Sequence, residues 1–153
     1  MSPAELERYL HDHIPLSKAM QVSVREIGSE AAVLAAPLAP NINHRETVFG
    51  GSASALAILA CWALLHVRLL EAGLSCRLVI QRSTMNYRRS IAGDFTARAV
   101  LAEGADWGRF RRLLERRGRA RIAATAVVSG EDAAAYFEGE FVALFSTTIS
   151  RGR

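Results

Sequence analysis

The pattern of hydrophobic and polar positions is dominated by one long apolar segment. No residue from Val48 to Val67 carries a formal charge, and alanine and leucine, both good helix formers, are its commonest residues. The pattern predicts a helix that begins near Gly50 or Gly51 and ends before Gly73. Because apolar residues surround the helix axis instead of following one stripe, such a helix is either buried in a protein core or spans a membrane.

A membrane span is the first alternative, because the uncharged run is long enough to cross a bilayer. Nearly half of the run is glycine, alanine and serine, however, which weakens its transfer into lipid. The rest of the chain carries amphipathic strands that need a surface to pack on. Small residues at Gly51, Ala55, Ala57 and Ala60 also suit the close approach of another backbone. We therefore expect a helix covered by a sheet and no insertion into a membrane.

Alternation of apolar and polar residues predicts six strands around this helix. A capping box at residues 2–5 starts an N-terminal helix that Pro15 ends, and Asp106 caps a short helix that Gly118 stops. Residues Ser150–Arg153 are expected to form a loose tail. The expected strands are Gln21–Ile27, Ala31–Ala36, Cys76–Arg89, Phe95–Ala102, residues 120–128 and a last strand through Phe137, Phe141 and Phe145.

The order of these elements predicts the fold class. Short turns between consecutive strands favour antiparallel pairing, and the resulting sheet must cover its apolar face. The only element that is apolar enough on all sides is the central helix. We therefore expect an α+β fold in which a six-stranded antiparallel sheet wraps around one long helix. The 153 residues are expected to form a single domain, residues 1–153.

Composition and charge narrow the classes of function. The net charge is +4, with Lys18 as the lone lysine, which is compatible with an anionic small ligand, with nucleic acid or with no specific partner. Aromatic residues make up 7% of the chain and form no stacking platform along the arginines, so we expect no nucleic-acid partner. The densest positive run, which we interpret as a solvated helix face, comprises Arg109, Arg111, Arg112, Arg116, Arg117, Arg119 and Arg121.

The cysteines and histidines give no sign of a metal centre. Cys61 and Cys76 lie far from the spacing of a metal site, and His11 and His13 are two residues apart, which points them to different faces of a helix. We therefore expect neither a metal nor another cofactor. The charged N-terminus is unlike a signal peptide and the two cysteines fit a reducing compartment, so we expect a cytoplasmic protein.

Two segments resemble a known family. NINHRETVFGGS at residues 41–52 opens the central helix, and MNYRRSIAGDFTARA at residues 85–99 follows it. In this order they resemble the hotdog-fold thioesterase superfamily. The helix around Trp62 and the stretch Trp107–Phe145 are similar to the thioesterase domain at the C-terminus of YiiD-type acetyltransferases. The resemblance, which covers nearly the whole chain, implies a homodimer or a dimer of dimers with sites between protomers that act on acyl thioesters of coenzyme A or of an acyl carrier protein.

The resemblance also carries over to individual residues. Asn43 matches the loop asparagine that positions substrate or water in related enzymes, and Gly50 and Gly51 match the glycine pair at the helix start. Phe49 stands where many relatives have histidine. Several relatives carry an acid two turns into the helix as the base, but residues 57–59 of this chain are alanine, isoleucine and leucine. The resemblance therefore does not identify the base.

The start of the central helix has a chemistry of its own. A helix that begins at Gly50 and Gly51 presents free backbone N–H groups at the positive end of its dipole. Glycines let a carbonyl approach without a Cβ in the way, so this start is a candidate oxyanion hole. One donor in such a hole contributes about 3 kcal/mol to stabilising the transition state. The alternative is that the glycines merely permit a tight turn from loop to helix.

Three further residues lie near the helix start. Glu46 is the only acid near the start of the helix, and it is a candidate general base if it is partly desolvated. Otherwise it is an exposed loop carboxylate that pairs with Arg45 or caps the helix. His44 is the second titratable candidate, with a surface position in the loop as the alternative. Ser52 is a site residue or simply a helix-start residue. Because no third group suggests a serine nucleophile, we expect direct attack by water.

The strand after the helix supplies the remaining candidates. Ser83 and Asn86 could reach across a dimer interface, or they are ordinary strand residues. Arg88 and Arg89 could bind the phosphates of coenzyme A, with solvated edge arginines as the alternative. The first hypothesis is therefore an acyl-thioester hydrolase. The second hypothesis is a non-catalytic acyl-coenzyme-A-binding or regulatory protein, which the missing helix acid favours. A dehydratase is a weaker hypothesis, because the histidine and the acid of the loop lack the surroundings that they have in dehydratases.

Overall fold

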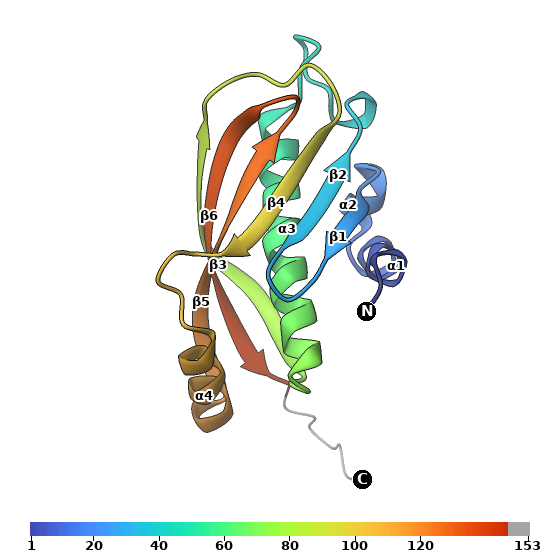
Figure 1. The fold of residues 1–153 in the computed structure, drawn as a ribbon. Helices are drawn as coiled ribbons and strands as arrows, with labels where there is room; N and C mark the ends of the chain where they lie inside the picture. Colours follow the sequence, from blue (N-terminus) through green and yellow to red (C-terminus); the bar gives the residue numbers. More distant parts are fainter. Residues whose placement is uncertain (147–153) are drawn as a thin grey trace.

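The computed structural model describes residues 1–146 and confirms the predicted α+β hotdog arrangement (Figure 1). Six antiparallel strands form one sheet in the order β1-β2-β4-β5-β6-β3, which curves around the long helix α3 (Gly50–Glu71). The expected tail Ser150–Arg153 lies outside the described residues. The strands are β1 (Ser23–Ile27), β2 (Ala32–Ala36), β3 (Cys76–Tyr87), β4 (Phe95–Leu101), β5 (Arg119–Ser129) and β6 (Ala133–Phe145).

The N-terminal helix α1 (Pro3–His13) starts at the predicted capping box. A proline ends α1 as expected but also opens a second helix, α2 (Pro15–Ala19), which the pattern did not predict; proline suits the first helical position. β1 starts at Ser23, two residues later than expected, because Gln21 has a φ of 57°, outside the strand region. A short 3₁₀ helix, η1 (Ala39–Asn41), leads into the loop before α3.

The sheet encloses α3 on most of its surface. The helix is long and apolar enough to meet the usual criteria for a membrane span, but 61% of its most apolar 18-residue window is buried inside the protein. Packing in the core therefore accounts for its hydrophobicity, as it does for the core helices of other proteins. One stripe along the helix remains half-exposed, and it contains Ala55, Ile58, Trp62 and His66.

The strand register decides which side chains face α3. Phe137 on β6 lies opposite Met85 on β3 and Ala126 on β5, and all three belong to the hydrophobic core or pack against it. Directly opposite residues share a face of the sheet, so this row faces the helix. A β-bulge between Ile80 and Arg82 inserts one extra residue into β3 and changes which residues of that strand point inward.

The short helix α4 (Trp107–Arg117) has the predicted ends. The N–H of Arg109 donates to Oδ1 of Asp106 at 3.0 Å, which caps the start. Gly118 ends the helix with a φ of 72°, a left-handed conformation that glycine adopts without strain. Phe110 and Leu114 are buried against β5, so α4 packs through one apolar face and turns its polar face outward.

Arg68, near the C-terminal end of α3, connects three elements. Its guanidinium lies 4.4 Å from the centre of the Trp107 ring on α4, a cation–π contact. The same group donates a hydrogen bond to the carbonyl of Ser29, in the turn between β1 and β2. These contacts tie α4 to the end of α3 that lies away from Gly50 (Figure 1).

Candidate functional site

The start of α3 is open and carries two backbone donors. Phe49 is the N-cap residue, and its carbonyl accepts from the N–H of Ser52 at 2.9 Å and of Ala53 at 3.1 Å. Within residues 1–146, the N–H groups of Gly50 and Gly51 have no acceptor, and no side chain caps the helix. Both donors therefore remain available at the positive end of the helix dipole.

Two aromatic rings lie against the glycine pair. A Cβ on Gly51 would lie 2.5 Å from Cε1 of Phe49, so the ring in this position requires glycine there, whereas a Cβ on Gly50 would make only an ordinary contact of 3.4 Å with Cε1 of Tyr87. The Tyr87 hydroxyl also donates to the carbonyl of Gly50 at 2.9 Å. The rings therefore flank the helix start, and the Phe49 side of this arrangement faces solvent because that residue is 57% exposed.

Two asparagines hold the loop before α3. Asn41 is buried, and its Nδ2 donates to two backbone carbonyls at 3.0 and 2.8 Å. Oδ1 of Asn43 accepts from the backbone N–H of Arg45 at 2.8 Å and of Thr47 at 3.1 Å, and its Nδ2 donates to Oγ1 of Thr47 at 2.9 Å. The Asn43 amide is thus engaged inside the loop, where it fixes the turn.

A hollow of about 370 Å³ lies beside the helix start. The loop forms one wall and the end of β3 with the residues after it forms the other; the N–H of Val48 joins the walls by donating to the carbonyl of Ile91 at 2.8 Å. This volume is within the range of small-molecule sites. The lining comprises Asn43, Thr47, Val48, Gly50, Ala53, Tyr87, Arg88, Arg89, Ser90, Ile91 and Ala135.

Four of the predicted site residues line this hollow: Asn43, Gly50, Arg88 and Arg89. The N–H groups of both arginines donate to one carbonyl of β6, at 2.8 and 3.1 Å, and their side chains are exposed. β3 ends before them, at Tyr87, whereas the pattern predicted a strand through Arg89. The Arg89 guanidinium lies 3.9 Å from Oδ2 of Asp132, which is outside the lining of this hollow.

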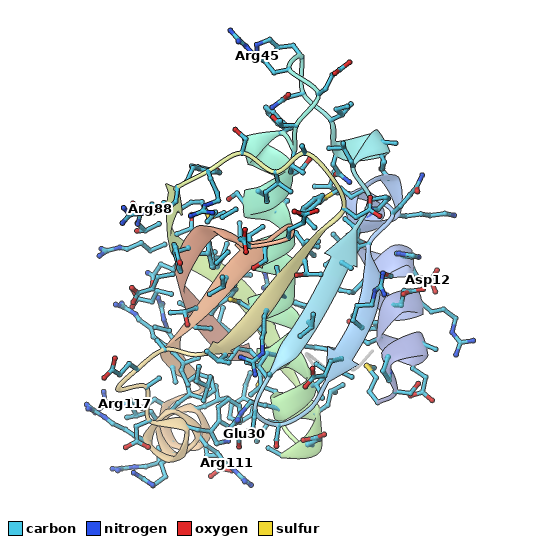
Figure 2. The ribbon with its side chains drawn as sticks, turned by 45° about the horizontal axis from the view of Figure 1, so that its top comes forward. Asp12, Glu30, Arg45, Arg88, Arg111 and Arg117 are labelled. Atoms are coloured by element: carbon cyan, nitrogen blue, oxygen red, sulfur yellow. The ribbon has the colours of Figure 1, made fainter. Side chains whose placement is uncertain are left out.

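The two titratable loop candidates lie elsewhere. His44 and Glu46 are exposed, and neither lines the hollow. Figure 2 shows Arg45, between them, at the far tip of a loop that projects beyond the sheet. Glu46 has a φ of 63°, within the turn that Asn43 closes. The described residues therefore place no carboxylate inside the hollow.

Five other predicted residues fall outside the lining. Phe49, Gly51 and Ser52 belong to the first turn of α3 or its cap, beside the hollow. Ser83 pairs with a β6 residue that faces α3, whereas Asn86 pairs with one on the outer face of the sheet. Because the two residues are three apart on a regularly paired part of β3, their side chains point to opposite faces of the sheet, and they cannot both contribute to one site within a protomer.

The pattern missed three polar members of the lining: Thr47, Tyr87 and Ser90. The inward position of Tyr87 could have been predicted from the sequence, because Tyr87 follows Met85 by two residues on a strand and therefore lies on the same face of the sheet. The other two lie in loops, where no periodicity shows which way a side chain points. Their place depends on contacts between segments that are far apart in sequence.

Groups with shifted pKa values lie away from the hollow. Burial raises the pKa of the Cys61 thiol and of the Cys76 thiol. Burial, and then the charge of nearby His13, lower the pKa of His66. None of these residues belongs to the lining of the hollow. Across residues 1–146, no group of three or more His, Cys, Asp or Glu side chains could hold a metal ion.

Comparisons with known proteins agree with this architecture. A sequence profile of the family described as "Putative thioesterase (yiiD_Cterm)" matches residues 3–145. A protein of unknown function from Chlorobaculum tepidum is similar over 94% of both chains, with 27% sequence identity and a TM-score of 0.87. A protein from Shewanella oneidensis described as a "putative thioesterase" is 21% identical over 93% of this chain and 96% of its own, with a TM-score of 0.82. A Pseudomonas aeruginosa protein of unknown function, described as a "probable thioesterase", is 21% identical over 94% of this chain and 97% of its own, with a TM-score of 0.79.

Proposed function

The chain belongs to the YiiD C-terminal thioesterase family, and from this premise we propose that it hydrolyses acyl thioesters of coenzyme A or of an acyl carrier protein. The observation that carries the proposal is the pair of free N–H groups on Gly50 and Gly51, beside a hollow of about 370 Å³. Such donors at a helix start favour an oxygen on which negative charge develops.

The proposed reaction is direct attack by water. The water oxygen forms a bond to the thioester carbonyl carbon, and the negative charge that develops on the carbonyl oxygen is stabilised by the N–H groups of Gly50 and Gly51. The C–S bond then breaks, the thiol leaves with one proton, and the carboxylic acid remains. Each donor of this kind contributes about 3 kcal/mol to stabilising the transition state.

The neighbouring residues have separate proposed roles. Asn43 keeps the loop in place, because its side-chain oxygen accepts a hydrogen bond from the N–H of Thr47. Tyr87 keeps the helix start in place, because its hydroxyl donates to the carbonyl of Gly50. Arg88 and Arg89, two exposed residues of the lining, would bind the phosphates of the carrier group. Phe49, which covers Gly51, would contact the thioester next to the donors.

The remaining candidates suit an interface between protomers. Glu46 as general base and His44 as a substrate contact both lie at the end of a projecting loop, outside the hollow of their own protomer. Ser83 and Asn86 lie on the edge strand β3. Ser52, in the first turn of α3, is proposed to assist the two donors. A second copy of the chain at this edge would be needed for these side chains to contribute.

The edge strand supports a homodimer. β3 is the last strand of the sheet, so its free side has backbone groups without a neighbouring strand. It is 12 residues long, and its Val79 and Ile80 side chains are 44% and 36% exposed. Long apolar edges pair readily with another strand, since pairing satisfies the free N–H and C=O groups. We therefore propose that two copies pair along β3 to form a homodimer. The same proposal extends to a tetramer built from two such dimers.

One observation favours a second candidate function. Among residues 1–146, no carboxylate or histidine lines the hollow, so a ligand could be held there without being activated for hydrolysis. This would make the protein a non-catalytic acyl-coenzyme-A-binding or regulatory protein.

An assay of thiol release separates the two candidates. Purified protein is given acyl-coenzyme A and acyl-carrier-protein thioesters of increasing chain length, and free thiol is measured for wild type, Asn43→Ala, Glu46→Ala and Tyr87→Phe. Hydrolysis that falls in these variants supports the proposed site. Wild-type rates in all three variants would remove the site, and tight binding without turnover at any chain length would favour the binding protein.

A further inference from the structure

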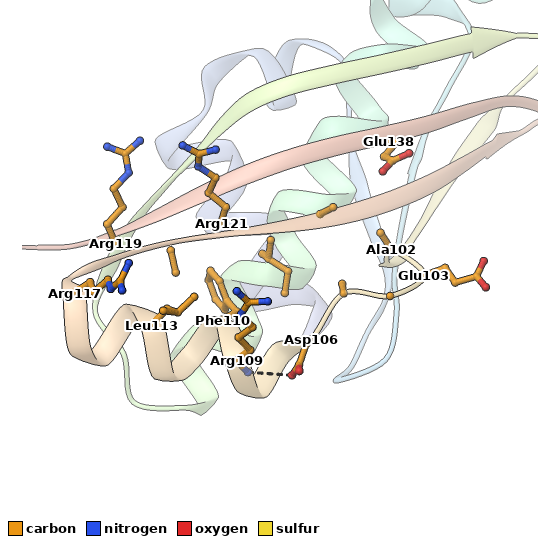
Figure 3. A pocket seen from close by; sticks show the side chains of 15 residues that line it. Ala102, Glu103, Asp106, Arg109, Phe110, Leu113, Arg117, Arg119, Arg121 and Glu138 are labelled. Atoms are coloured by element: carbon orange, nitrogen blue, oxygen red, sulfur yellow. Dashed lines mark hydrogen bonds between the residues drawn. The ribbon is translucent and has the colours of Figure 1, made fainter.

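A second hollow, larger than the one at the start of α3, lies elsewhere in the described residues. A groove of about 750 Å³ lies between α4 and β5 (Figure 3). Phe110 and Leu113 lie between the helix and the strand. Figure 3 shows Arg109 and Arg117 on α4, and Arg119 and Arg121 on β5 with side chains that point away from the helix. The proposed hydrolysis uses none of these residues.

The groove is lined by four arginines and by three acids, Glu103, Asp106 and Glu138, and it lies in the most positive part of the chain. Residues 106–121 contain seven arginines against Asp106 and Glu115, a net charge of +5, whereas the whole chain has 19 cations against 15 acids, a net charge of +4. The rest of the chain, with 12 cations and 13 acids, therefore has a net charge of −1. A charge so concentrated creates a local field that attracts an anionic partner.

Most of these arginines have no internal partner. Arg111 pairs with Glu115 at 3.3 Å, and Arg121 lies 3.8 Å from Glu140 on β6. Asp106 is engaged as the cap of α4. The other five arginines of this stretch are exposed and form no ion pair within residues 1–146; they are Arg109, Arg112, Arg116, Arg117 and Arg119.

The extent of the surface favours a macromolecule over a small anion. α4 has 11 residues and is therefore about 16 Å long, and its arginines occupy both ends of this length. Arg119 and Arg121 add two positive charges on the adjoining face of β5, which is turned away from α4. A single phosphate group would cover only a small part of this row, whereas an acidic helix or surface of a protein matches it in length and charge.

The surface lies at the opposite end of α3 from the donors of the same protomer. α4 contacts Arg68, 18 residues after Gly50, which corresponds to about 27 Å along the helix. Antiparallel pairing of two β3 strands would also place the two α3 helices antiparallel. The helix start of the partner subunit would then lie at the same end of the dimer as this arginine surface.

We propose that the arginine surface of α4 and β5 is the docking site of an acidic acyl carrier protein, which delivers its thioester to the site of the partner subunit. This inference rests on the proposed function and the proposed dimer, and it selects the carrier protein over coenzyme A as the group that bears the natural substrate. The aromatic residues of α4 do not support nucleic acid as the partner, because Phe110 is buried and the half-buried Trp107 ring is already stacked against the Arg68 guanidinium.

The test compares two carriers of the same acyl group. Hydrolysis of octanoyl-carrier protein and of octanoyl-coenzyme A is measured for wild type and for Arg109→Glu/Arg117→Glu. The control is Arg8→Glu/Arg25→Glu, which reverses the charge of two exposed arginines on α1 and β1. Reversing two charges of the docking surface is expected to lower kcat/KM for the carrier-protein substrate about tenfold or more, with little effect on the coenzyme A substrate. The control variant is expected to retain the wild-type kcat/KM for both.

Each outcome has a separate meaning. A selective loss with the carrier protein, together with an association that weakens as salt is added, supports the docking site. Equal loss with both substrates in a variant of unchanged melting temperature would assign the groove to coenzyme A and overturn the inference, as would an unchanged rate with the carrier protein. Salt-sensitive binding of an oligonucleotide that is lost in the groove variant would assign it to nucleic acid. Failure of wild type to cleave either substrate would instead contradict the proposed function.

Discussion

At the start of α3, each glycine has a different aromatic neighbour. Tyr87 packs on Gly50 and is bonded to its carbonyl, so it holds the first turn from the side of the sheet. Phe49 covers Gly51 from the solvent side and is more than half exposed. The absence of both Cβ atoms leaves the two N–H groups accessible, which is the property that the proposed reaction needs.

The variant Gly51→Ala tests this arrangement. The new methyl group would displace the exposed Phe49 ring and crowd the donors, so we expect kcat to fall roughly ten- to hundredfold, with a melting temperature close to that of wild type. Gly28→Ala is the control, because nothing lies within 4 Å of a Cβ at that position. Wild-type turnover in Gly51→Ala would show that the helix start is not the oxyanion site.

His66 predicts a dependence of stability on pH. Its ring stacks on Trp62 and on Tyr9 of α1, its Nε2 is buried without a partner among the described residues, and burial followed by the charge of His13 lowers its pKa. Between that lowered value and the ordinary value of about 6.5, the unfolded chain binds a proton that the folded chain does not. Stability is therefore expected to fall as the pH drops through this window.

Melting temperatures near neutral pH and near pH 5.5 check this expectation. In His66→Phe, which keeps an aromatic ring in the stack, the difference in melting temperature between the two pH values should be smaller than in wild type. His44→Phe is the control, because His44 is exposed in a loop. An equal pH dependence in wild type and His66→Phe would mean that other groups cause it.

At the scale of the element, the helices differ in what their sequence specifies. α3 is stabilised by burial on most sides, and its start has no side-chain cap, so its position depends on the sheet. α4 has a complete set of local signals, with a cap at Asp106, one apolar face and a stop at Gly118. Its ends were therefore predictable from sequence, while its place against Arg68 was not.

The cap of α4 gives a stability prediction. Asp106→Ala removes the acceptor for the Arg109 N–H, and loss of an N-cap side chain costs about 1 kcal/mol. The free energy of unfolding, measured with urea, should fall by about this amount. Asp12→Ala is the control: Asp12 is in the last turn of α1, where a carboxylate opposes the helix dipole, so its removal should not destabilise the protein. Equal losses in both variants would contradict the capping role.

At the scale of the whole molecule, the free edge of β3 predicts self-association. Light scattering after gel filtration should give a dimer or a larger assembly for wild type. In Val79→Lys/Ile80→Lys, charges placed on the edge should shift the protein to a monomer, because lysines block edge pairing. Leu16→Lys changes an exposed leucine of α2, away from this edge, and should keep the wild-type mass. A monomeric wild type would exclude the dimer and the docking geometry built on it.

By itself, the sequence determined the elements and their order. The signals that predict an element act within a few residues of one another; they are the apolar run of α3, the alternation of the strands and the caps of α1 and α4. The structure agrees with the predicted elements apart from α2 and small shifts of strand ends. The glycine pair at the start of α3 was found for the same reason, because a helix start is a local feature.

Only the tertiary structure decided which side chains meet. Tyr87 reaches Gly50 across 37 residues of chain, and the walls of the hollow join where Val48 bonds to Ile91. The course of the projecting loop took Glu46 away from the hollow that its nearness in sequence suggested. Contacts of this kind depend on register, twist and loop course, which are fixed by the packing of the whole sheet around α3 and leave no periodic trace in the chain.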